Sequence, residues 1–237
     1  MSFQATLQQA AEQAGFPLTE AQLAQFTQYA AQLLETNKTL NLTAITDPDE
    51  VALKHMVDSL LVYNAGHFHN KTVVDVGTGA GFPGLPLKLY DTTMRLTLID
   101  ALQKRLHFLE EVVASLQLGQ VRLLHARAED AGRDPKLREA FDTAVSRAVA
   151  ALPVLCEYCL PLVRVGGVCY ALKGSKGPEE AEAARHAVQV LGGKITDVQS
   201  VALPGLTDQR TLITITKIRP TPKQYPRKAG TAAKRPL

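Results

Sequence analysis

The stretch that decides the fold runs from Val73 to Gly84 and reads VVDVGTGAGFPG. It joins an apolar run to an acid and then to four glycines in eight residues. This pattern predicts a buried strand, a tight turn and the start of a helix, which together present backbone N–H groups to a polar ligand. The surrounding sequence distinguishes among three kinds of ligand: a dinucleotide, a nucleoside triphosphate and a molecule without phosphates.

Apolar runs and helix-length segments alternate after this stretch. The apolar runs are residues 72–76, 96–100, 121–125, 143–148 and 166–172, and the segments between them are 82–90, 101–116, 128–141 and 152–163. Such alternation predicts a parallel sheet with helices on both faces. Two further runs, 195–203 and 210–218, are separated only by a short turn at 204–209, which predicts an antiparallel hairpin at the sheet edge. The fold class is therefore α/β, doubly wound and mostly parallel, with seven strands.

Residues 1–70 read as a helical extension. Thr19 and Gln22 have the spacing of a capping box, and apolar residues follow at helical intervals as far as Leu34. Asp47 followed by Pro48 predicts a second helix start. Residues 64–71 are polar, so we expect a loop there, with solvated histidines at positions 67 and 69.

Charge is unevenly distributed along a chain whose net charge is +3. From Lys217 to the C-terminus there are seven Lys or Arg residues and no acid, so residues 1–216 carry −4. Pro and Gly interrupt this basic segment, which predicts an extended or disordered arm. The arm suits contact with phosphates, although a solubilising tail gives the same pattern. We expect a sheet domain over residues 71–218 and the basic arm over 219–237.

The three cysteines do not indicate a disulfide framework or a metal site. Cys156 and Cys159 form a CxxC pair inside an apolar segment, with no further ligand nearby, so they read as core residues. The sequence starts without the pattern of a signal peptide and contains no apolar run of membrane-spanning length. We therefore expect a cytoplasmic protein with no metal and no membrane partner.

The glycine turn does not suit a phosphate ligand. Leu85 and Pro86 stand where a P-loop requires Lys and Ser or Thr. A dinucleotide site is harder to exclude, because GxGxxG occurs from Gly79 and Asp100 follows at about the spacing of a ribose-binding acid. However, Gly77 is the glycine that closes the strand, and Asp75 just before it would repel a pyrophosphate and attract an amino group.

The pattern Asp75-Val-Gly77-Thr-Gly79-Ala-Gly81 resembles the DxGxGxG motif of class I S-adenosylmethionine-dependent methyltransferases. Their cofactor has an amino group, an adenosine, a sulfonium and no phosphates. The resemblance implies the Rossmann-like fold of that class, with Asp100 accepting hydrogen bonds from the ribose hydroxyls.

A longer set of motifs resembles one family, the bacterial small-subunit ribosomal RNA guanine-N7 methyltransferases, also called glucose-inhibited division protein B (RsmG, GidB). The set comprises Asn41-Leu42-Thr43, Lys54-His55-x-x-Asp58-Ser59, the glycine turn, Asp100-x-x-x-Lys104-Arg105, His125-Ala-Arg127-Ala128-Glu129, Ser146-Arg147-Ala148 and Ala171-Leu172-Lys173-Gly174. The family implies that Gly77, Phe82, Asp100, Ala101, Leu102, Ala128, Glu129 and Arg147 contact S-adenosylmethionine. It also implies 16S ribosomal RNA as the partner, free or in the small subunit.

The residues after the fourth strand agree with a guanine N7 target. Ser146-Arg-Ala-Val149 is not the [DN]PP[YF] motif of exocyclic-amine methyltransferases, and no Pro-Cys supplies the nucleophile that carbon-5 methylation of a pyrimidine needs. Guanine N7 is a lone pair with no proton to lose, so transfer requires positioning rather than a base. We expect Arg147 to provide that positioning.

Further basic residues are candidates for RNA contact: Lys104, Arg105, Arg127, Lys173, Arg227 and Lys228. Asn41, His55, Asp58 and Ser59 either pack the helical extension against the glycine turn or touch the substrate. Two other functions stay open at this point, a nicotinamide-dependent oxidoreductase and a non-catalytic RNA-binding module. The first lacks a Tyr-x-x-x-Lys relay, and the second leaves the Asp75 to Asp100 set unexplained. A monomer is the default assembly.

Overall fold

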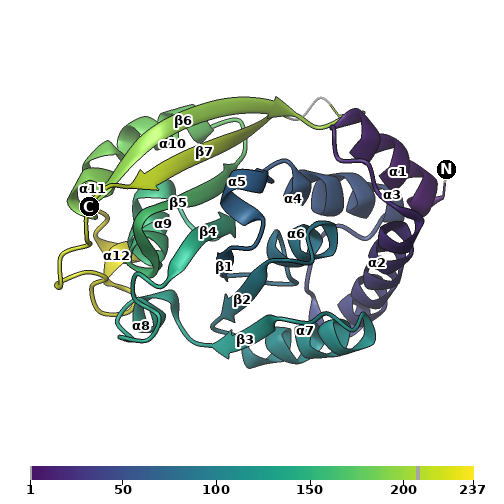
Figure 1. Cartoon of the computed structure of the whole chain (residues 1–237), viewed down its shortest axis with the longest axis horizontal. Coiled ribbons are helices and arrows are strands. Elements are labelled where there is room, and N and C mark those ends of the chain that lie inside the picture. Colours follow the sequence, from purple (N-terminus) through teal and green to yellow (C-terminus); the bar gives the residue numbers. More distant parts are fainter. Residues whose placement is uncertain (1, 207–208) are drawn as a thin grey trace.

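The computed structural model describes residues 2–206 and 209–237. Its centre is a seven-stranded sheet in the order β3-β2-β1-β4-β5-β7-β6 (Figure 1). The strands are β1 (Thr72–Val76), β2 (Arg95–Asp100), β3 (Val121–His125), β4 (Phe141–Arg147), β5 (Val163–Lys173), β6 (Gly193–Ala202) and β7 (Gln209–Lys217). All seven predicted strands are present, because each is an apolar run too short and too β-branched to favour a helix.

The first five strands pair in parallel, and β7 pairs antiparallel with both β5 and β6. This confirms the doubly wound α/β fold with an antiparallel hairpin. Within the sheet, β7 lies between β5 and β6, so β6 forms the edge. Part of the predicted hairpin turn, Thr207 and Asp208, lies outside the described residues.

Helices cover both faces of the sheet because successive side chains of a buried strand point to opposite sides. Val73 of β1 belongs to one hydrophobic cluster and Val74 to another. The first cluster is covered by α6 (Gly84–Tyr90), α7 (Gln103–Ser115) and the N-terminal helices. The second is covered by α8 (Ala128–Ala131), α9 (Leu152–Cys159), the 3-10 turn η2 (Leu160–Leu162), α10 (Gly177–Ala183) and α11 (Arg185–Val190).

The N-terminal extension consists of α1 (Phe3–Gln13), α2 (Glu20–Leu40), α3 (Pro48–Val51), the π-helical segment η1 (Ala52–Val57) and α4 (Asp58–Leu60). The Thr19–Gln22 capping box and the Asp47 cap are both present, as predicted. Leu7, Phe26 and Met56 are fully buried in the same cluster as Val73. The extension therefore shares its core with the sheet domain.

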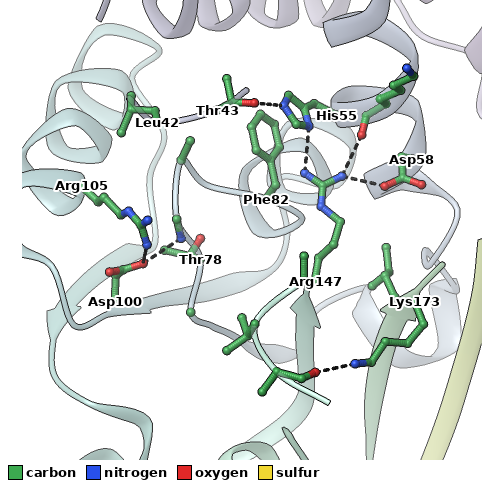
Figure 2. A pocket seen from close by; sticks show the side chains of 18 of the residues that line it. Leu42, Thr43, His55, Asp58, Thr78, Phe82, Asp100, Arg105, Arg147 and Lys173 are labelled. Carbon is green, nitrogen blue, oxygen red and sulfur yellow. Dashed lines mark hydrogen bonds and ion pairs between the residues drawn. The ribbon is translucent and has the colours of Figure 1, made fainter. Parts of the chain in front are cut away.

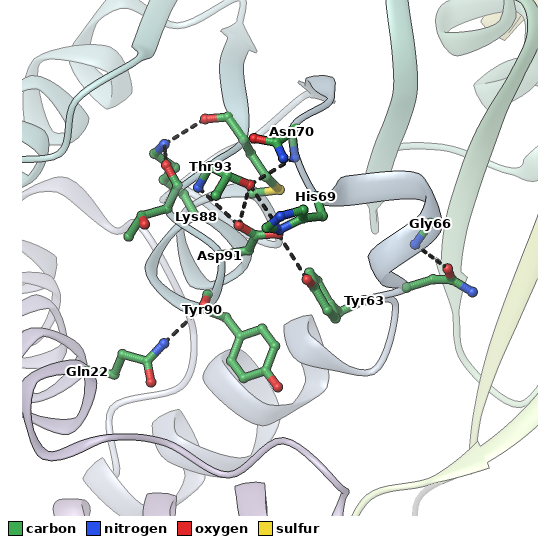
Figure 3. Close-up of polar contacts among 12 residues, drawn as sticks. Gln22, Tyr63, Gly66, His69, Asn70, Lys88, Tyr90, Asp91 and Thr93 are labelled. Carbon is green, nitrogen blue, oxygen red and sulfur yellow. Dashed lines mark hydrogen bonds and ion pairs between the residues drawn. The ribbon is translucent and has the colours of Figure 1, made fainter.

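Figure 3 shows the polar contacts that fasten the extension beside α6. Gln22 Nε2 donates to the carbonyl oxygens of Leu89 and Tyr90, at 3.2 and 3.0 Å. The Tyr63 hydroxyl donates to Asp91 Oδ2 at 2.9 Å. The two bonds from Gln22 satisfy carbonyl groups at the end of α6 that have no partner within the helix.

Several sequence expectations need correction. The segment 64–71, expected to be a loop, contains α5 (Ala65–Phe68), in which the Asn64 side chain caps the first turn and His67 Nδ1 lies 2.6 Å from the Tyr170 hydroxyl. The segment 128–141 is helical only as far as Ala131, because Gly132 and Pro135 do not support a continuing helix. The pair α10 and α11 was not predicted at all.

The C-terminal arm is also different from the expected extended tail. It packs against the body and ends in α12 (Thr231–Lys234), near α8 and α9 in Figure 1. Arg138 donates to the carbonyl oxygens of Thr221 and Tyr225, at 2.7 and 2.8 Å. Arg227 pairs with Glu157, whose carboxylate is fully buried. The distribution of charge along the sequence does not predict this packing, because it does not show which acidic side chains are buried and need a cationic partner.

Cys156, Cys159 and Cys169 are free and buried, in agreement with core roles. Burial raises the pKa of the Cys156 thiol well above its usual value. Across residues 2–206 and 209–237, no cluster of three or more His, Cys, Asp or Glu side chains is arranged to hold a metal ion. In the same part of the chain, no helix has the length and apolar character needed to cross a membrane.

Candidate functional site

A cavity of about 1030 Å³ opens at the carboxyl ends of β1, β2 and β4 (Figure 2). This is the edge of an open α/β sheet at which ligands bind. Most of its wall is built from the segment 42–45 with the π-helical segment, the glycine turn, the start of α7, and the ends of β4 and β5 with the loops that follow. Glu180 and Arg210 complete the wall. The volume is large enough for a cofactor together with part of a second substrate.

The glycine turn follows β1 and is braced from behind by Asp75. This carboxylate is fully buried, and its Oδ2 accepts hydrogen bonds from Thr78 Oγ1 at 2.7 Å and from the Gly84 N–H at 2.9 Å. Burial raises the pKa of Asp75 to about 6, against the lowering effect of those two bonds. Asp75 does not line the cavity, and its Oδ1 has no partner among the described residues.

Gly79 and Gly81 meet different surroundings at the two sides of the turn, and both have positive φ. A Cβ at Gly81 would lie 2.5 Å from the Tyr29 hydroxyl, which itself donates to the Ala80 carbonyl. A Cβ at Gly79 would meet nothing within 4 Å. Gly81 therefore serves close packing with α2, whereas Gly79 faces open space in the cavity.

Asp100 ends β2 and faces the glycine turn. Its Oδ2 accepts from the Gly79 N–H at 2.9 Å, and its Oδ1 accepts from the Leu102 N–H at 2.8 Å. Arg105 Nη1 lies 3.4 Å from Oδ2. Asp100 is 3% exposed and still lines the cavity beside Ala101 and Leu102. A carboxylate held in this way retains lone pairs for the hydroxyl groups of a ribose.

These features fit S-adenosylmethionine on structural grounds. The cavity has a fixed carboxylate at the end of the second strand and a glycine with open space above it. No lysine stands at the turn to neutralise a phosphate, and the buried Asp75 behind the turn disfavours a second anion. Leu102, 44% exposed, adds an apolar surface for a flat ring system.

Arg147, at the end of β4, is held by three groups of the N-terminal extension. Nη1 donates to Asp58 Oδ2 at 2.7 Å and to the Lys54 carbonyl at 3.1 Å, and Nη2 lies 3.2 Å from His55 Nδ1. The guanidinium carbon lies 5.0 Å from the centre of the Phe82 ring. Lys54 and His55 lie in the π-helical segment and Asp58 directly follows it, so all three contact one cation. Figure 2 shows His55 and Asp58 on either side of the Arg147 guanidinium.

Asp58 connects this cluster to the edge hairpin. It is 3% exposed, and its Oδ1 accepts from Arg210 Nε at 2.9 Å while Oδ2 accepts from Arg147. Ser59 donates to the His55 carbonyl and so stays inside the helix, and Asn41 ends α2 in the left-handed conformation. His55, Asp58 and Ser59 therefore have defined partners, whereas Asn41 is exposed and its backbone N–H donates to the Asn37 carbonyl.

Phe82 and His55 form the aromatic part of the wall. Their rings are stacked with centroids 4.5 Å apart, and the Tyr29 ring also stacks on Phe82, with centroids 5.5 Å apart. Burial and the adjacent Arg147 charge lower the pKa of His55 to about 3. The imidazole is therefore neutral near pH 7.

Lys173 clamps the loop that follows β4. Its Nζ donates to the Ala150 carbonyl at 2.5 Å and lies 2.7 Å from Glu180 Oε2, which accepts from the Leu152 N–H. The side chain is 7% exposed. Contact with RNA, as predicted for Lys173, would require breaking this arrangement.

The cavity brings together most of the predicted site residues: Gly77, Gly79, Phe82, Asp100, Ala101, Leu102, Arg105, Arg147 and Lys173. The others lie outside its wall: Asp75, Gly81, Lys104, Arg127, Ala128, Glu129, Arg227 and Lys228. Glu129 is buried, and its Oε1 accepts from the Gly230 N–H of the C-terminal arm at 2.9 Å. Lys104, Arg127 and Lys228 are exposed.

Sequence reasoning missed several lining residues, namely Leu42, Thr43, Ile45, Glu180 and Arg210. Thr43 ends the Asn41-Leu42-Thr43 motif, and Arg210 begins a predicted strand. No local pattern marks them, because they reach the cavity through the packing of the extension and the hairpin. Thr43 Oγ1 lies 2.7 Å from His55 Nε2, which connects it to the Arg147 cluster.

Comparison with known proteins agrees with these motifs. The family described as rRNA small subunit methyltransferase G (GidB) matches residues 22–213. The ribosomal RNA small subunit methyltransferase G of Lactobacillus johnsonii is 52% identical over 94% of this chain and 95% of its own. The protein of the same name from Pelotomaculum thermopropionicum is 46% identical over 98% of both chains.

Solved structures share the fold at low identity. A SAM-dependent methyltransferase from Aquifex aeolicus superimposes with a TM-score of 0.55 at 18% identity, over 77% of this chain and 97% of that chain. This likeness, together with the strand order, identifies the class I methyltransferase fold. From the match over most of its length, the chain belongs to the rRNA small subunit methyltransferase G family.

Proposed function

We propose that this protein transfers a methyl group from S-adenosylmethionine to N7 of a guanine in 16S ribosomal RNA. The observation that carries the proposal is the pairing of two halves in one cavity. One half has the Asp100 carboxylate and the open Gly79, and the other has Arg147 held by the extension. Family membership supports the RNA substrate.

The cofactor half comprises Gly77, Gly79, Phe82, Asp100, Ala101 and Leu102, with Asp75 and Gly81 shaping the turn from behind. We assign ribose binding to Asp100, because both of its oxygens are fixed by backbone N–H groups at the cavity wall. Bound S-adenosylmethionine would supply an electrophilic methyl group on sulfur. Ala128 and Glu129, for which the family resemblance implies cofactor contacts, lie outside the cavity wall, and Glu129 accepts a hydrogen bond from the C-terminal arm.

The target half suits a nucleophile that needs no deprotonation. His55 is a poor base because burial lowers its pKa to about 3. Asp58 is occupied by two arginines. Guanine N7 presents its lone pair without a proton, so these residues need only hold the base and exclude water. Arg147 has the planar fork that suits positioning of a carboxylate, a guanine O6 or a phosphate.

We further propose a division of roles along the chain. Residues 71–218 bind the cofactor, residues 1–70 close the target half, and residues 219–237 brace α8 and α9. Lys104, Arg127 and Lys228 are the exposed candidates for RNA phosphates, with Arg105 at the cavity rim. The protein is proposed to act as a monomer in the cytoplasm on 16S RNA, free or within the small subunit.

The test is methyl transfer from labelled S-adenosylmethionine to unmodified small subunits and to their naked RNA. Products are mapped by chemical cleavage at 7-methylguanine. The proposal expects one cleavage site in 16S RNA, which is lost with Arg147→Ala. Label without 7-methylguanine would contradict the N7 assignment, and no label in either RNA would contradict the ribosomal substrate.

A further inference from the structure

Thr43 is held rigidly at the target half of the cavity. Asn37 of α2 fixes its backbone from both sides, because Oδ1 accepts from the Thr43 N–H at 2.8 Å and Nδ2 donates to the Thr43 carbonyl at 2.9 Å. The chain reaches this point through Asn41 in the left-handed conformation. Figure 2 shows Thr43 beside His55 and Phe82.

The direction of the hydrogen bonds can be followed outward from Arg147. A guanidinium has only donors, so its Nη2 donates to His55 Nδ1, which therefore carries no proton. A neutral imidazole keeps one proton, and that proton is then on Nε2. Nε2 donates to Thr43 Oγ1 across 2.7 Å.

The Thr43 oxygen receives a second bond from the Ile45 N–H at 3.0 Å. A threonine hydroxyl has two acceptor sites and one donor. Both acceptor sites are filled by N–H groups, so only the hydroxyl proton remains. Within residues 2–206 and 209–237 no acceptor takes this proton, and Thr43 lines the cavity.

We propose that the Thr43 hydroxyl donates a hydrogen bond to an acceptor oxygen of the substrate bound in this cavity. The inference rests on the proposed function for the identity of that substrate. Two oxygens have the required chemistry, O6 of the target guanine and the carboxylate of the cofactor. Donation to O6 would favour guanine over adenine, because adenine carries an amino group at the corresponding position.

The hydrogen-bond direction is tested without any measurement of activity. Nitrogen-15 NMR of the full-length protein, with the His55 signals assigned through His55→Gln, reports which ring nitrogen carries the proton. The expected result is Nε2–H. A proton on Nδ1 would overturn the proposal, because Nε2 would then accept from Thr43 and use its hydroxyl proton.

The two sources of oxygen are separated with Thr43→Val, which removes the hydroxyl, and Thr43→Ser, which keeps it. If the base is the source, Thr43→Val lowers kcat/KM roughly five- to tenfold on RNA with guanine at the target. The loss disappears on RNA with 2-aminopurine there, because that base lacks O6. If the cofactor is the source, Thr43→Val weakens S-adenosylhomocysteine by a similar factor but not 5′-methylthioadenosine, which lacks the carboxylate.

Thr43→Ser keeps the hydroxyl, so it is expected to retain most of the kcat/KM or nucleoside affinity that Thr43→Val loses. Equal losses on both bases together with equal losses on both nucleosides would overturn the proposal, since they would indicate only a packing defect. If the unaltered protein does not methylate guanine-containing RNA, the proposed function fails. The NMR result and the nucleoside comparison still decide the role of Thr43 in that case.

Discussion

Single residues of the site are fixed by contacts that originate far away in the sequence. Asp58 shows this most clearly, because it receives Arg147 from β4 and Arg210 from β7 on different oxygens. A carboxylate can accept from both arginines, whereas the amide nitrogen of asparagine would face one of them as a donor.

Asp58→Asn is therefore expected to displace Arg147 and to slow methyl transfer by roughly 100-fold, the scale of a small misplacement at a reacting centre. Single-turnover transfer measures the effect. Asp130→Asn, at an exposed aspartate outside the cavity, serves as the control and should not change the rate. A folded Asp58→Asn protein with normal transfer would contradict the role of Asp58.

Asp142 stabilises the fold, and its contribution to the free energy of unfolding depends on pH. Thr72 donates to Oδ2 through both its N–H and its hydroxyl, and Arg164 donates to Oδ1 at 2.7 Å. These bonds overcome burial and lower the pKa of Asp142 to about 2. The unfolded value is about 3.9, so the stabilisation is present above that pH and is lost as pH falls toward 2.

Asp142→Asn is expected to cost about 2 kcal/mol of unfolding free energy at pH 7 and about half of that at pH 3. Urea unfolding of both proteins at the two pH values gives the comparison. A cost that does not change with pH would show that the carboxylate charge contributes nothing.

At the scale of elements, the sequence predicted strands and caps well and predicted short helices poorly. The seven strands follow from apolar runs, and the starts of α2 and α3 follow from side chains that bond to their own first turns. These are local signals. The π form of residues 52–57, within a predicted helix, and the pair α10 and α11 were not predicted; these elements are stabilised by burial against their neighbours.

The residues of the candidate site also fall into two groups, those with a local sequence signal and those without one. Gly77, Gly79 and Asp100 belong to one strand–turn–helix–strand unit, so their spacing predicted their meeting. Thr43 and Arg210 come from opposite ends of the chain and meet in the cavity only through tertiary packing. Their contribution could not be read from local sequence.

The contacts of the C-terminal arm indicate a structural role, in contrast to the extended tail that its composition predicts. Arg227 Nη2 lies 2.6 Å from Glu157 Oε2, and that glutamate has no exposed surface. Arg227→Ala would leave a buried, unpaired charge and is expected to cost on the order of 3 kcal/mol in urea unfolding.

Lys228→Ala is the matched control, because Lys228 is adjacent and exposed. It should leave stability unchanged and, if it contacts phosphates, weaken RNA binding in a salt-dependent way. Equal stability of the two variants would contradict the bracing role of the arm.

At the scale of the molecule, the extension and the sheet domain share one hydrophobic cluster, which includes Leu7, Phe26, Val73 and Leu98. A shared core of this kind couples the two parts energetically. The cavity is formed between them, so the site and the fold depend on the same packing.

The protein is accordingly expected to unfold in urea as one cooperative transition. Far-ultraviolet circular dichroism, which reports the helices of the extension, and tyrosine signals near the sheet should coincide; the chain has six tyrosines and no tryptophan. Loss of helical signal at a clearly lower urea concentration would show that the extension is an independent unit.

The central claim is that the glycine turn and Asp100 hold S-adenosylmethionine. Gly79→Ala tests it, because the added methyl group would enter the open space of the cavity at φ 60°. Gly15→Ala is the matched control, with φ 84° and open space at the junction of α1 and α2. Both changes place alanine in a strained backbone region, so their costs to stability are comparable.

The most direct measurement is calorimetric titration of S-adenosylmethionine and of NAD into the unaltered protein and these two variants. We expect binding of S-adenosylmethionine and not of NAD, a loss of at least about tenfold in Gly79→Ala, and unchanged affinity in Gly15→Ala. Binding of NAD, or S-adenosylmethionine affinity that does not respond to Gly79→Ala, would contradict the assignment of the cavity.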